Sequence, residues 1–176
     1  MTQTPAEIQR SYYAKTAAAY DAMHDSEDGG HTWAIDRLAD LIEDVDAQTV
    51  LDVGTGTGRA LKAIVQRYPH VAAHGVDPVP ELIALAVERH GIPAHAISLG
   101  SGDALSFPDN SFDVVCEFGV LHDVPDPAAV VREMLRVARR GIVISDSNRF
   151  GQVRPRRVGS SLAFWSAPLG SVHCAP

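Results

Sequence analysis

The sequence is poor in the residues that build disulfide frameworks. Only two cysteines, Cys116 and Cys174, occur among its 176 residues, and they lie far apart. Cys116 falls within an apolar run, which is typical of a small buried side chain, and Cys174 is interpreted as an incidental thiol. Neither lies in a spacing typical of metal ligands, so we expect neither a disulfide nor a metal site.

The sequence also lacks long apolar runs, and none approaches the roughly 20 residues that a membrane-spanning helix needs. Its first residues carry neither a basic patch nor an apolar core, so a secretory signal is not expected. Cations are in deficit, and the formal net charge of −7 argues against a partner held by phosphate contacts. We therefore expect a cytoplasmic protein with no membrane or nucleic-acid partner. A basic cluster in the tail fits either a solvated segment or an anionic partner; it comprises Arg149, Arg154, Arg156 and Arg157.

Short β-branched apolar runs alternate with amphipathic stretches along the middle of the chain. This alternation is typical of repeated βαβ units and predicts an α/β fold with a doubly wound, mostly parallel sheet. We expect five strands, over about 49–53, 71–76, 94–99, 112–116 and 142–145. We expect helices over about 5–23, 31–43, 59–67, 80–90 and 127–140, the last capped by Asp126, with a polar loop at 25–30.

A glycine-rich turn, Gly54-Thr-Gly-Thr-Gly58, lies between the first predicted strand and a helix. Glycine lets a ligand approach the backbone closely, and a helix start offers unpaired N–H groups to an anion. Asp77 lies 19 residues after Gly58, at the expected end of the next strand, where a carboxylate can accept from a ribose diol. The arrangement fits nicotinamide and S-adenosylmethionine enzymes, although Arg59 replaces the third glycine of the nicotinamide pattern. A glycine turn without a ligand is the alternative.

Five segments in order, within roughly residues 10–150, resemble those of one family. They are Val50-Leu-Asp-Val-Gly-Thr-Gly-Thr-Gly58, His74-Gly-Val-Asp-Pro78, and the segments 102–115, 120–124 and 133–138. The chain thereby resembles the class I S-adenosylmethionine-dependent methyltransferases, and its last two segments resemble the branch that acts mostly on small molecules. The resemblance implies a Rossmann-like domain over residues 1–150, S-adenosylmethionine as the cofactor, and an N-terminal helical lid over about 1–45.

The resemblance also implies which residues hold the cofactor. The methionine end would lie against Asp52, Gly54, Thr55, Gly56 and Gly58. The adenosyl end would lie against Asp77, Pro78, Asp103 and the Ala104 backbone N–H, with Asp77 on the ribose. Glu117 and Phe118 would line the pocket near the transferred methyl. Asp52 as a turn-stabilising carboxylate and Asp103 as a cap of a local turn are the alternatives.

His122 is the candidate catalytic base, because it follows the fourth strand at the ligand edge and imidazole titrates near neutral pH. A histidine packed against a neighbour is the alternative. On the N-terminal lid, Tyr12 and Tyr20 are the candidates for lining the pocket, with simple packing against the domain as the alternative.

The residues after the fifth strand differ from the family's pattern. A full class I fold adds a helix and two strands there, but only 31 residues follow Ser145. We expect residues 151–176 to form an irregular tail that supplies at most one short helix rather than a hairpin plus a helix, in a chain that is either naturally short, or truncated or altered near its end. An uncovered fifth strand would promote association, so we expect a homo-oligomer or docking of the tail.

Three functions are compatible with these features. The first is methyl transfer to a small molecule, favoured over a DNA base because Cys116-Glu-Phe-Gly119 lacks the Asn/Asp-Pro-Pro-aromatic motif. The second is a non-catalytic module that binds S-adenosylmethionine or S-adenosylhomocysteine, which the short tail favours. The third is a nicotinamide-binding Rossmann domain, which Arg59 disfavours.

Overall fold

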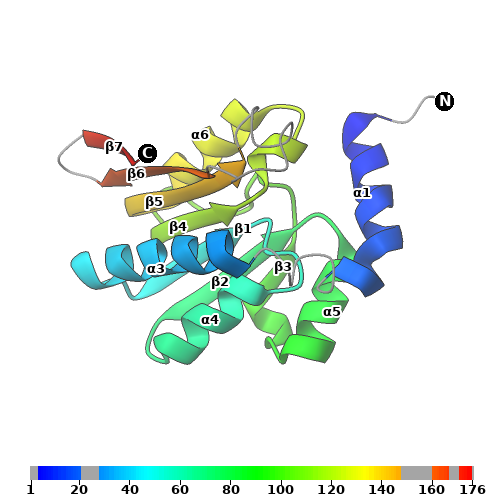
Figure 1. Ribbon diagram of the computed structural model, residues 1–176, viewed down its shortest axis with the longest axis horizontal. Helices are drawn as coiled ribbons and strands as arrows, with labels where there is room; N and C mark the ends of the chain where they lie inside the picture. Colours follow the sequence, from blue (N-terminus) through cyan, green and yellow to red (C-terminus); the bar gives the residue numbers. More distant parts are fainter. Residues whose placement is uncertain (1–3, 21–27, 148–159, 167–170, 176) are drawn as a thin grey trace.

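One seven-stranded sheet organises the chain (Figure 1). The computed structural model describes residues 4–20, 28–147, 160–166 and 171–175. The strands are β1 (Thr49–Val53), β2 (Ala72–Asp77), β3 (Ile97–Leu99), β4 (Phe112–Phe118), β5 (Ala138–Ser147), β6 (Ser160–Ser166) and β7 (Ser171–Ala175). Their order in the sheet is β3-β2-β1-β4-β5-β6-β7, and β1 to β5 are parallel. The predicted α/β fold with five parallel strands is confirmed.

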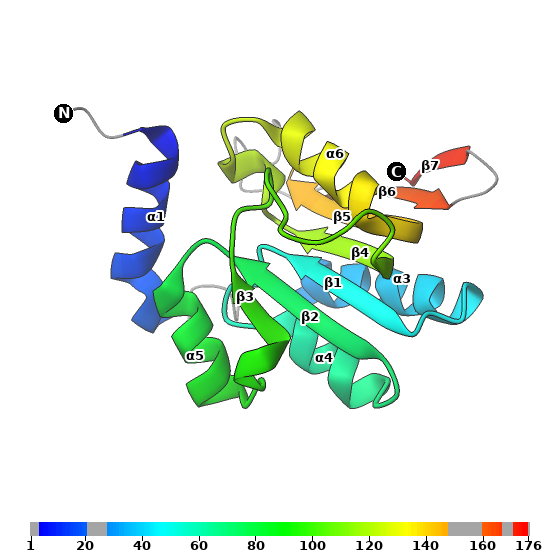
Figure 2. The same cartoon turned by 180° about the vertical axis from the view of Figure 1, so that it is seen from behind.

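Helices cover both faces of this sheet and one of its edges. They are α1 (Pro5–Thr16), α3 (Asp28–Asp44), α4 (Arg59–Arg67), α5 (Pro80–His90) and α6 (Pro127–Val137), with 3-10 turns η1 (Ala17–Ala19), η3 (Ala94–Ala96) and η4 (Leu121–Asp123). Helices α3, α4 and α5 pack on one face and α6 on the other (Figures 1 and 2). Helix α1 stands across the carboxyl ends of the strands, where doubly wound folds bind ligands. No helix of the described ranges is long and apolar enough to cross a bilayer.

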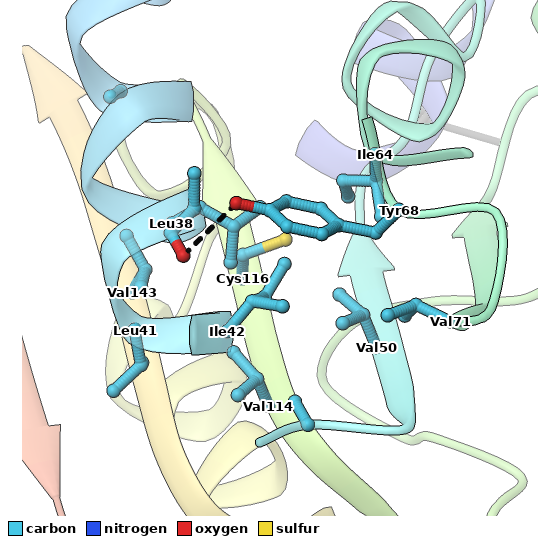
Figure 3. Close-up of a cluster of buried hydrophobic side chains, with 13 residues drawn as sticks. Leu38, Leu41, Ile42, Val50, Ile64, Tyr68, Val71, Val114, Cys116 and Val143 are labelled. Carbon is cyan, nitrogen blue, oxygen red and sulfur yellow. Dashed lines mark hydrogen bonds between the residues drawn. The ribbon is translucent and has the colours of Figure 1, made fainter. Parts of the chain in front are cut away.

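Alternate residues of the central strands build the core beneath α3. Val50 of β1 pairs in register with Val114 of β4, so both side chains project toward the same face. Figure 3 shows this cluster, whose labelled members are Leu38, Leu41, Ile42, Val50, Ile64, Tyr68, Val71, Val114, Cys116 and Val143. Cys116 is fully buried, as predicted. The Tyr68 hydroxyl donates to the Glu43 carboxylate and lies 3.4 Å from the Ala39 carbonyl, so the polar tip of this largely apolar side chain has partners.

Helix boundaries in the N-terminal region differ from the prediction. Helix α1 begins at Pro5, where Thr4 and Glu7 form a capping box, but it ends at Thr16 rather than near residue 23. The 3-10 turn η1 follows, and residues 21–27 lie outside the described ranges. Helix α3 already includes Asp28, so the last three residues of the predicted 25–30 loop are helical.

The junction of α6 and β5 also differs from the prediction. The expected helix over 127–140 ends at Val137, and Ala138 already pairs with Phe112 of β4. The two arginines that were expected to complete the helix have other partners. Arg139 Nη1 lies 2.9 Å from Asp113 Oδ1, and Arg140 donates to the Val45 carbonyl. These contacts and the strand pairing stabilise an extended backbone where the basic residues and Gly141 suggested a helix end.

The segment expected to be an irregular tail contains two strands, so that prediction is wrong for 160–166 and 171–175. Strand β6 pairs antiparallel with β5, from Gly141↔Ser166 to Ser147↔Ser160, and β7 pairs antiparallel with β6. The Phe and Trp residues of β6 favour strands. Without β6, the edge of β5 would expose a row of unpaired backbone groups. Of the two expected ways of covering that edge, the structure has docking of the tail.

Candidate functional site

A pocket opens at the carboxyl ends of β1, β2 and β4, beneath α1. Six residues that the sequence assigned to the site line it: Tyr20, Gly54, Gly56, Asp77, Pro78 and Phe118. Nine others that were not assigned line it too: Gln9, Arg10, Tyr13, Val79, Leu82, Gly119, Val120, Asp123 and Val124. Segments far apart in the sequence therefore meet at the edge of the sheet where the glycine turn lies.

The glycine turn brings this edge together through its own backbone. The amides of Gly54 and Thr55 donate to the Val76 carbonyl at 2.8 and 3.1 Å, which ties the end of β1 to β2. Gly54 has φ +73°, and a Cβ there would lie 2.3 Å from Val120 Cγ2. Gly56 has φ +56°, and a Cβ there would lie 3.7 Å from the Tyr20 ring. Gly56 thus leaves the floor of the pocket open beneath the lid.

Asp77 is held at the floor of the pocket by two backbone donors. Its Oδ2 accepts from Gly56 N at 2.8 Å, and its Oδ1 accepts from Val79 N at 2.9 Å. Burial raises the pKa of Asp77 to about 6, against the opposing effect of the two hydrogen bonds. Each carboxylate oxygen has a second lone pair, so Asp77 can still accept from two ligand hydroxyls.

Asp52 and Thr55 lie behind the glycine turn rather than on the pocket wall. Asp52 is 2% exposed, and its Oδ2 accepts from the Thr55 hydroxyl at 2.7 Å. Burial raises the pKa of Asp52 to about 6. Asp52 therefore braces the turn through Thr55, and its contact with the methionine end of the cofactor stays a prediction. Gly58, at φ +79°, caps α4 and packs against Ile92, away from the pocket lining.

Glu117 is fully buried beneath the loop that follows β4. Its Oε2 accepts from Val120 N at 2.9 Å, while its Oε1 has no hydrogen-bond partner within the described part of the chain. Burial raises the pKa of Glu117 to about 8, so the proton is retained at neutral pH. The neighbouring Phe118 reaches the pocket, and Glu117 supports the loop from below.

Asp103 and Ala104 are exposed and are not among the residues that line the pocket. Ala104 N donates to the Ser101 carbonyl at 3.2 Å, within a local turn. The loop beyond them is anchored to α6, since Leu105 N donates to Glu133 Oε2 at 2.8 Å and Arg136 donates to the Leu105 carbonyl at 2.9 Å. Of the three aspartates expected to converge, the structure therefore brings two together at the glycine turn.

On α1, Tyr13 rather than Tyr12 faces the pocket. Tyr12 is 55% exposed, whereas the Tyr13 hydroxyl donates to Asp123 Oδ2 and its ring lies 6.0 Å from that of Tyr20. Burial raises the pKa of Tyr13. Ala17 is buried against Val79 and Leu82, which packs the N-terminal segment against the domain. The helical spacing of Tyr13, Ala17 and Tyr20 is the sequence signal for this inner face.

His122 lies beside the pocket in η4. Its Nδ1 lies 2.5 Å from Asp146 Oδ1, and its backbone N–H donates to Asp146 Oδ2 at 3.0 Å. The hydrogen bond with Asp146 raises the pKa of His122, while partial burial opposes it. His122 is therefore a partnered histidine at the ligand edge, as either sequence interpretation allows.

Comparisons with known proteins agree with this geometry. A model of the methyltransferase domain family matches residues 51–144. A demethylmenaquinone methyltransferase of Roseiflexus castenholzii is 36% identical over 146 residues, covering 77% of this chain and 58% of the relative. A phosphatidylethanolamine N-methyltransferase of Cereibacter sphaeroides is 37% identical over 107 residues, covering 58% of this chain and 51% of the relative. The chain thus spans just over half the length of these two relatives.

A solved structure shows the same fold. Magnesium protoporphyrin IX methyltransferase from Synechocystis superposes with a TM-score of 0.70 at 18% identity, over 84% of this chain and 78% of that one. The family match begins within β1 and ends within β5, so it includes the carboxyl ends of β1, β2 and β4 that meet at the pocket. The family's cofactor is S-adenosylmethionine, and the open floor at Gly56 with the carboxylate of Asp77 beside it suits an adenosyl ligand. From strand order, glycine turn and family match together, the chain belongs to the class I S-adenosylmethionine-dependent methyltransferases.

Proposed function

We propose that this chain transfers the methyl group of S-adenosylmethionine to a small-molecule acceptor. The observation that carries the proposal is the convergence of Gly56, Asp77 and Phe118, from the ends of three strands, in one pocket beneath a tyrosine-bearing lid. The names of the relatives support a small acceptor, since they describe methylation of demethylmenaquinone, phosphatidylethanolamine and, in Rauvolfia serpentina, ajmaline.

The pocket's own residues would bind and orient rather than react. When bound, S-adenosylmethionine supplies an electrophilic sulfonium methyl, so transfer is an in-line displacement that needs alignment above all. Alignment of two reactants can contribute roughly 7–11 kcal/mol to lowering the barrier. Asp77 would accept from the ribose hydroxyls and Pro78 would pack beside the adenine, while Tyr13 and Tyr20 would limit access of water from the lid side. Asp103 and Ala104 stay predicted adenine contacts.

Binding of S-adenosylhomocysteine and NAD, measured in parallel by calorimetry, tests the cofactor. We expect S-adenosylhomocysteine to bind and NAD not to bind; the reverse would identify a nicotinamide domain. Gly56→Ala and Gly91→Ala are matched, since both glycines have positive φ and each alanine costs about 1–2 kcal/mol of backbone strain. A Cβ at Gly91 meets nothing within 4 Å, so only Gly56→Ala should weaken ligand binding, by at least about 10-fold.

Methyl transfer itself needs a separate assay over a diverse acceptor panel. Formation of S-adenosylhomocysteine with any acceptor supports an enzyme. Tight binding of the cofactor without product over the whole panel favours the non-catalytic module instead. Cytoplasmic location and homo-oligomeric assembly stay predictions, the latter measurable by light scattering.

A further inference from the structure

A hydrogen-bonded pair joins the loop after β4 to the end of β5. His122 lies in η4, and Asp146 lies near the carboxyl end of β5. Asp146 meets His122 twice, through Oδ1 at 2.5 Å from Nδ1 and through Oδ2, which accepts from the backbone N–H at 3.0 Å. Two contacts from one carboxylate fix both the backbone position and the ring orientation of His122.

The other side of the imidazole lies against two residues that line the pocket. His122 Cε1 lies 3.8 Å from where a Cβ of Gly119 would stand, and Nε2 lies 3.7 Å from Asp123 Oδ2. Gly119 and Asp123 both line the pocket. The alternative is a loop histidine that only packs against its neighbours. Packing alone does not require one ring nitrogen to bond a carboxylate while the other lies beside a residue of the pocket.

The pairing also determines which ring nitrogen can accept a proton. A carboxylate only accepts hydrogen bonds, so Nδ1 carries the proton that it donates to Asp146. In the neutral ring, Nε2 is then the unprotonated nitrogen, on the side of Asp123. An aspartate that holds histidine in this tautomer is the arrangement by which a histidine serves as a general base.

We propose that His122, positioned by Asp146, takes the proton of a hydroxyl acceptor, so that the acceptors of this chain are alcohols, phenols or enols. The proposal rests on the methyl transfer proposed above. The hydroxyl oxygen forms a bond to the methyl carbon, the carbon–sulfur bond breaks with its electron pair going to sulfur, and the hydroxyl proton passes to Nε2. The products are a methyl ether and S-adenosylhomocysteine, and the imidazolium later returns its proton to water.

A general base at this position would assist methylation of a hydroxyl group more than methylation of an amine. A neutral amine attacks through a free lone pair and loses its proton after transfer, whereas an alcohol or phenol is a weak nucleophile until its proton is removed. Such a base contributes about 10²–10⁴-fold to the rate. The carboxyl groups that face His122 are Asp146 of β5, Asp123 of η4 and Glu117 of β4, and Asp123 also accepts from Tyr13 of the lid.

The test uses the full chain and four variants. His122→Ala removes the base, and Asp146→Asn keeps the shape but removes the charge that orients it. The matched controls are His95→Asn and Asp44→Asn, because both side chains are exposed and neither lines the pocket. Each protein is given S-adenosylmethionine with three probe sets, phenols and alcohols, primary amines, and thiols, and S-adenosylhomocysteine formation is measured from pH 5 to 9.

We expect methylation of hydroxyl probes, lowered at least about 100-fold by His122→Ala and about 10-fold by Asp146→Asn, with the controls unchanged. Because the hydrogen bond with Asp146 and the charge of Asp146 raise the pKa of His122, the acidic limb of the pH profile should move to lower pH in Asp146→Asn, which a merely structural role of Asp146 would not cause. Amine or thiol methylation that is insensitive to His122→Ala overturns the proposal, as does no turnover of any hydroxyl probe.

Two further measurements separate this proposal from the proposed function and from misfolding. Failure of wild-type protein to bind S-adenosylhomocysteine would refute the methyltransferase function itself, whereas intact binding with the wrong acceptor class refutes only the role of His122. The ¹⁵N shifts of His122 report its tautomer without any acceptor. A protonated Nδ1 supports the proposal, and a protonated Nε2 with bare Nδ1 overturns it.

Discussion

The two ends of the sheet both bury carboxyl groups, but the donors around them differ. At the amino end of β4, Asp113 accepts from Gln48 N, Thr49 N and the Thr49 hydroxyl, and it lies 2.9 Å from Arg139. At the carboxyl end, Asp77 has two backbone donors, and Glu117 has one donor and one oxygen without a partner among the described residues. A carboxylate whose oxygens are fully hydrogen-bonded stabilises the fold. A carboxyl group with fewer donors keeps lone pairs that can accept from a ligand or a loop.

The charges of the two ends follow from this difference. Burial would raise the pKa of Asp113, but the donors and the Arg139 cation outweigh it and lower the pKa. At the carboxyl end the donors are too few, so burial raises the pKa of Asp77 to about 6 and that of Glu117 to about 8. The buried acid at the amino end therefore loses its proton at a lower pH than a free carboxyl group. The two buried acids at the pocket end keep their protons to a higher pH.

The largest expected effect comes from breaking the amino end. Asp113→Ala should lower the free energy of unfolding by roughly 1–3 kcal/mol, because it leaves the partly buried backbone donors of Gln48 and Thr49 without their acceptor, while half-exposed Arg139 can turn to solvent. Urea denaturation measures it, with the exposed Asp44→Ala as control. A loss below about 1 kcal/mol would contradict the structural role.

The second prediction concerns Asp77, at the carboxyl end of the sheet, where a substitution should affect ligand binding more than stability. Asp77→Asn should weaken S-adenosylhomocysteine binding by about 10- to 100-fold, because hydrogen bonds to a charged acceptor are worth about 1.5–3 kcal/mol. Its stability loss should be smaller than that of Asp113→Ala. Calorimetry and urea denaturation on the same samples check both parts. An Asp77→Asn protein with unchanged affinity would remove Asp77 from the ligand.

The third prediction concerns the pH dependence of stability. The pKa of Glu117 rises from 4.5 to about 8 on folding, so the folded state keeps a proton that the unfolded chain releases. Its contribution is fully present below pH 4.5 and is lost as the pH rises through 8. Glu117→Gln should flatten the decline in unfolding free energy between pH 5 and 8. An equally steep decline in the variant, measured in urea, would assign it to other groups.

The smallest effect concerns the lid. Tyr13→Phe removes the hydroxyl that donates to Asp123 and keeps the ring that packs near Tyr20. A net hydrogen bond is worth about 0.5–1.5 kcal/mol, so cofactor affinity should fall by about 2- to 10-fold. Tyr12→Phe is the matched control, since Tyr12 is exposed and should leave affinity unchanged.

Local patterns predicted the parallel strands and the residues that end them. The apolar runs before Gly54 and Asp77 identified β1 and β2, and the strand ends placed Gly56, Asp77 and Phe118 at one edge, where the structure has the pocket. Such residues are predictable because parallel strands order their carboxyl ends by topology alone.

Contacts between distant segments account for what the sequence could not predict. The end of α6 depends on Asp113 as partner of Arg139, and the strand at 160–166 depends on the free edge of β5. The choice of Tyr13 over Tyr12 depends on Asp123, which lies 110 residues away. Each is a tertiary partner that no window of neighbouring residues contains.

The position of Gly54 has a consequence for how glycine turns are interpreted. A side chain at this position would collide with Val120 of the loop after β4. Packing within the protein therefore requires glycine here, whether or not a ligand is bound. One bare α-carbon thereby sets the spacing between two loops that together shape a binding surface. A glycine motif in such a fold can therefore reflect close packing between two loops of the protein. The space that remains between those loops is what a ligand can occupy.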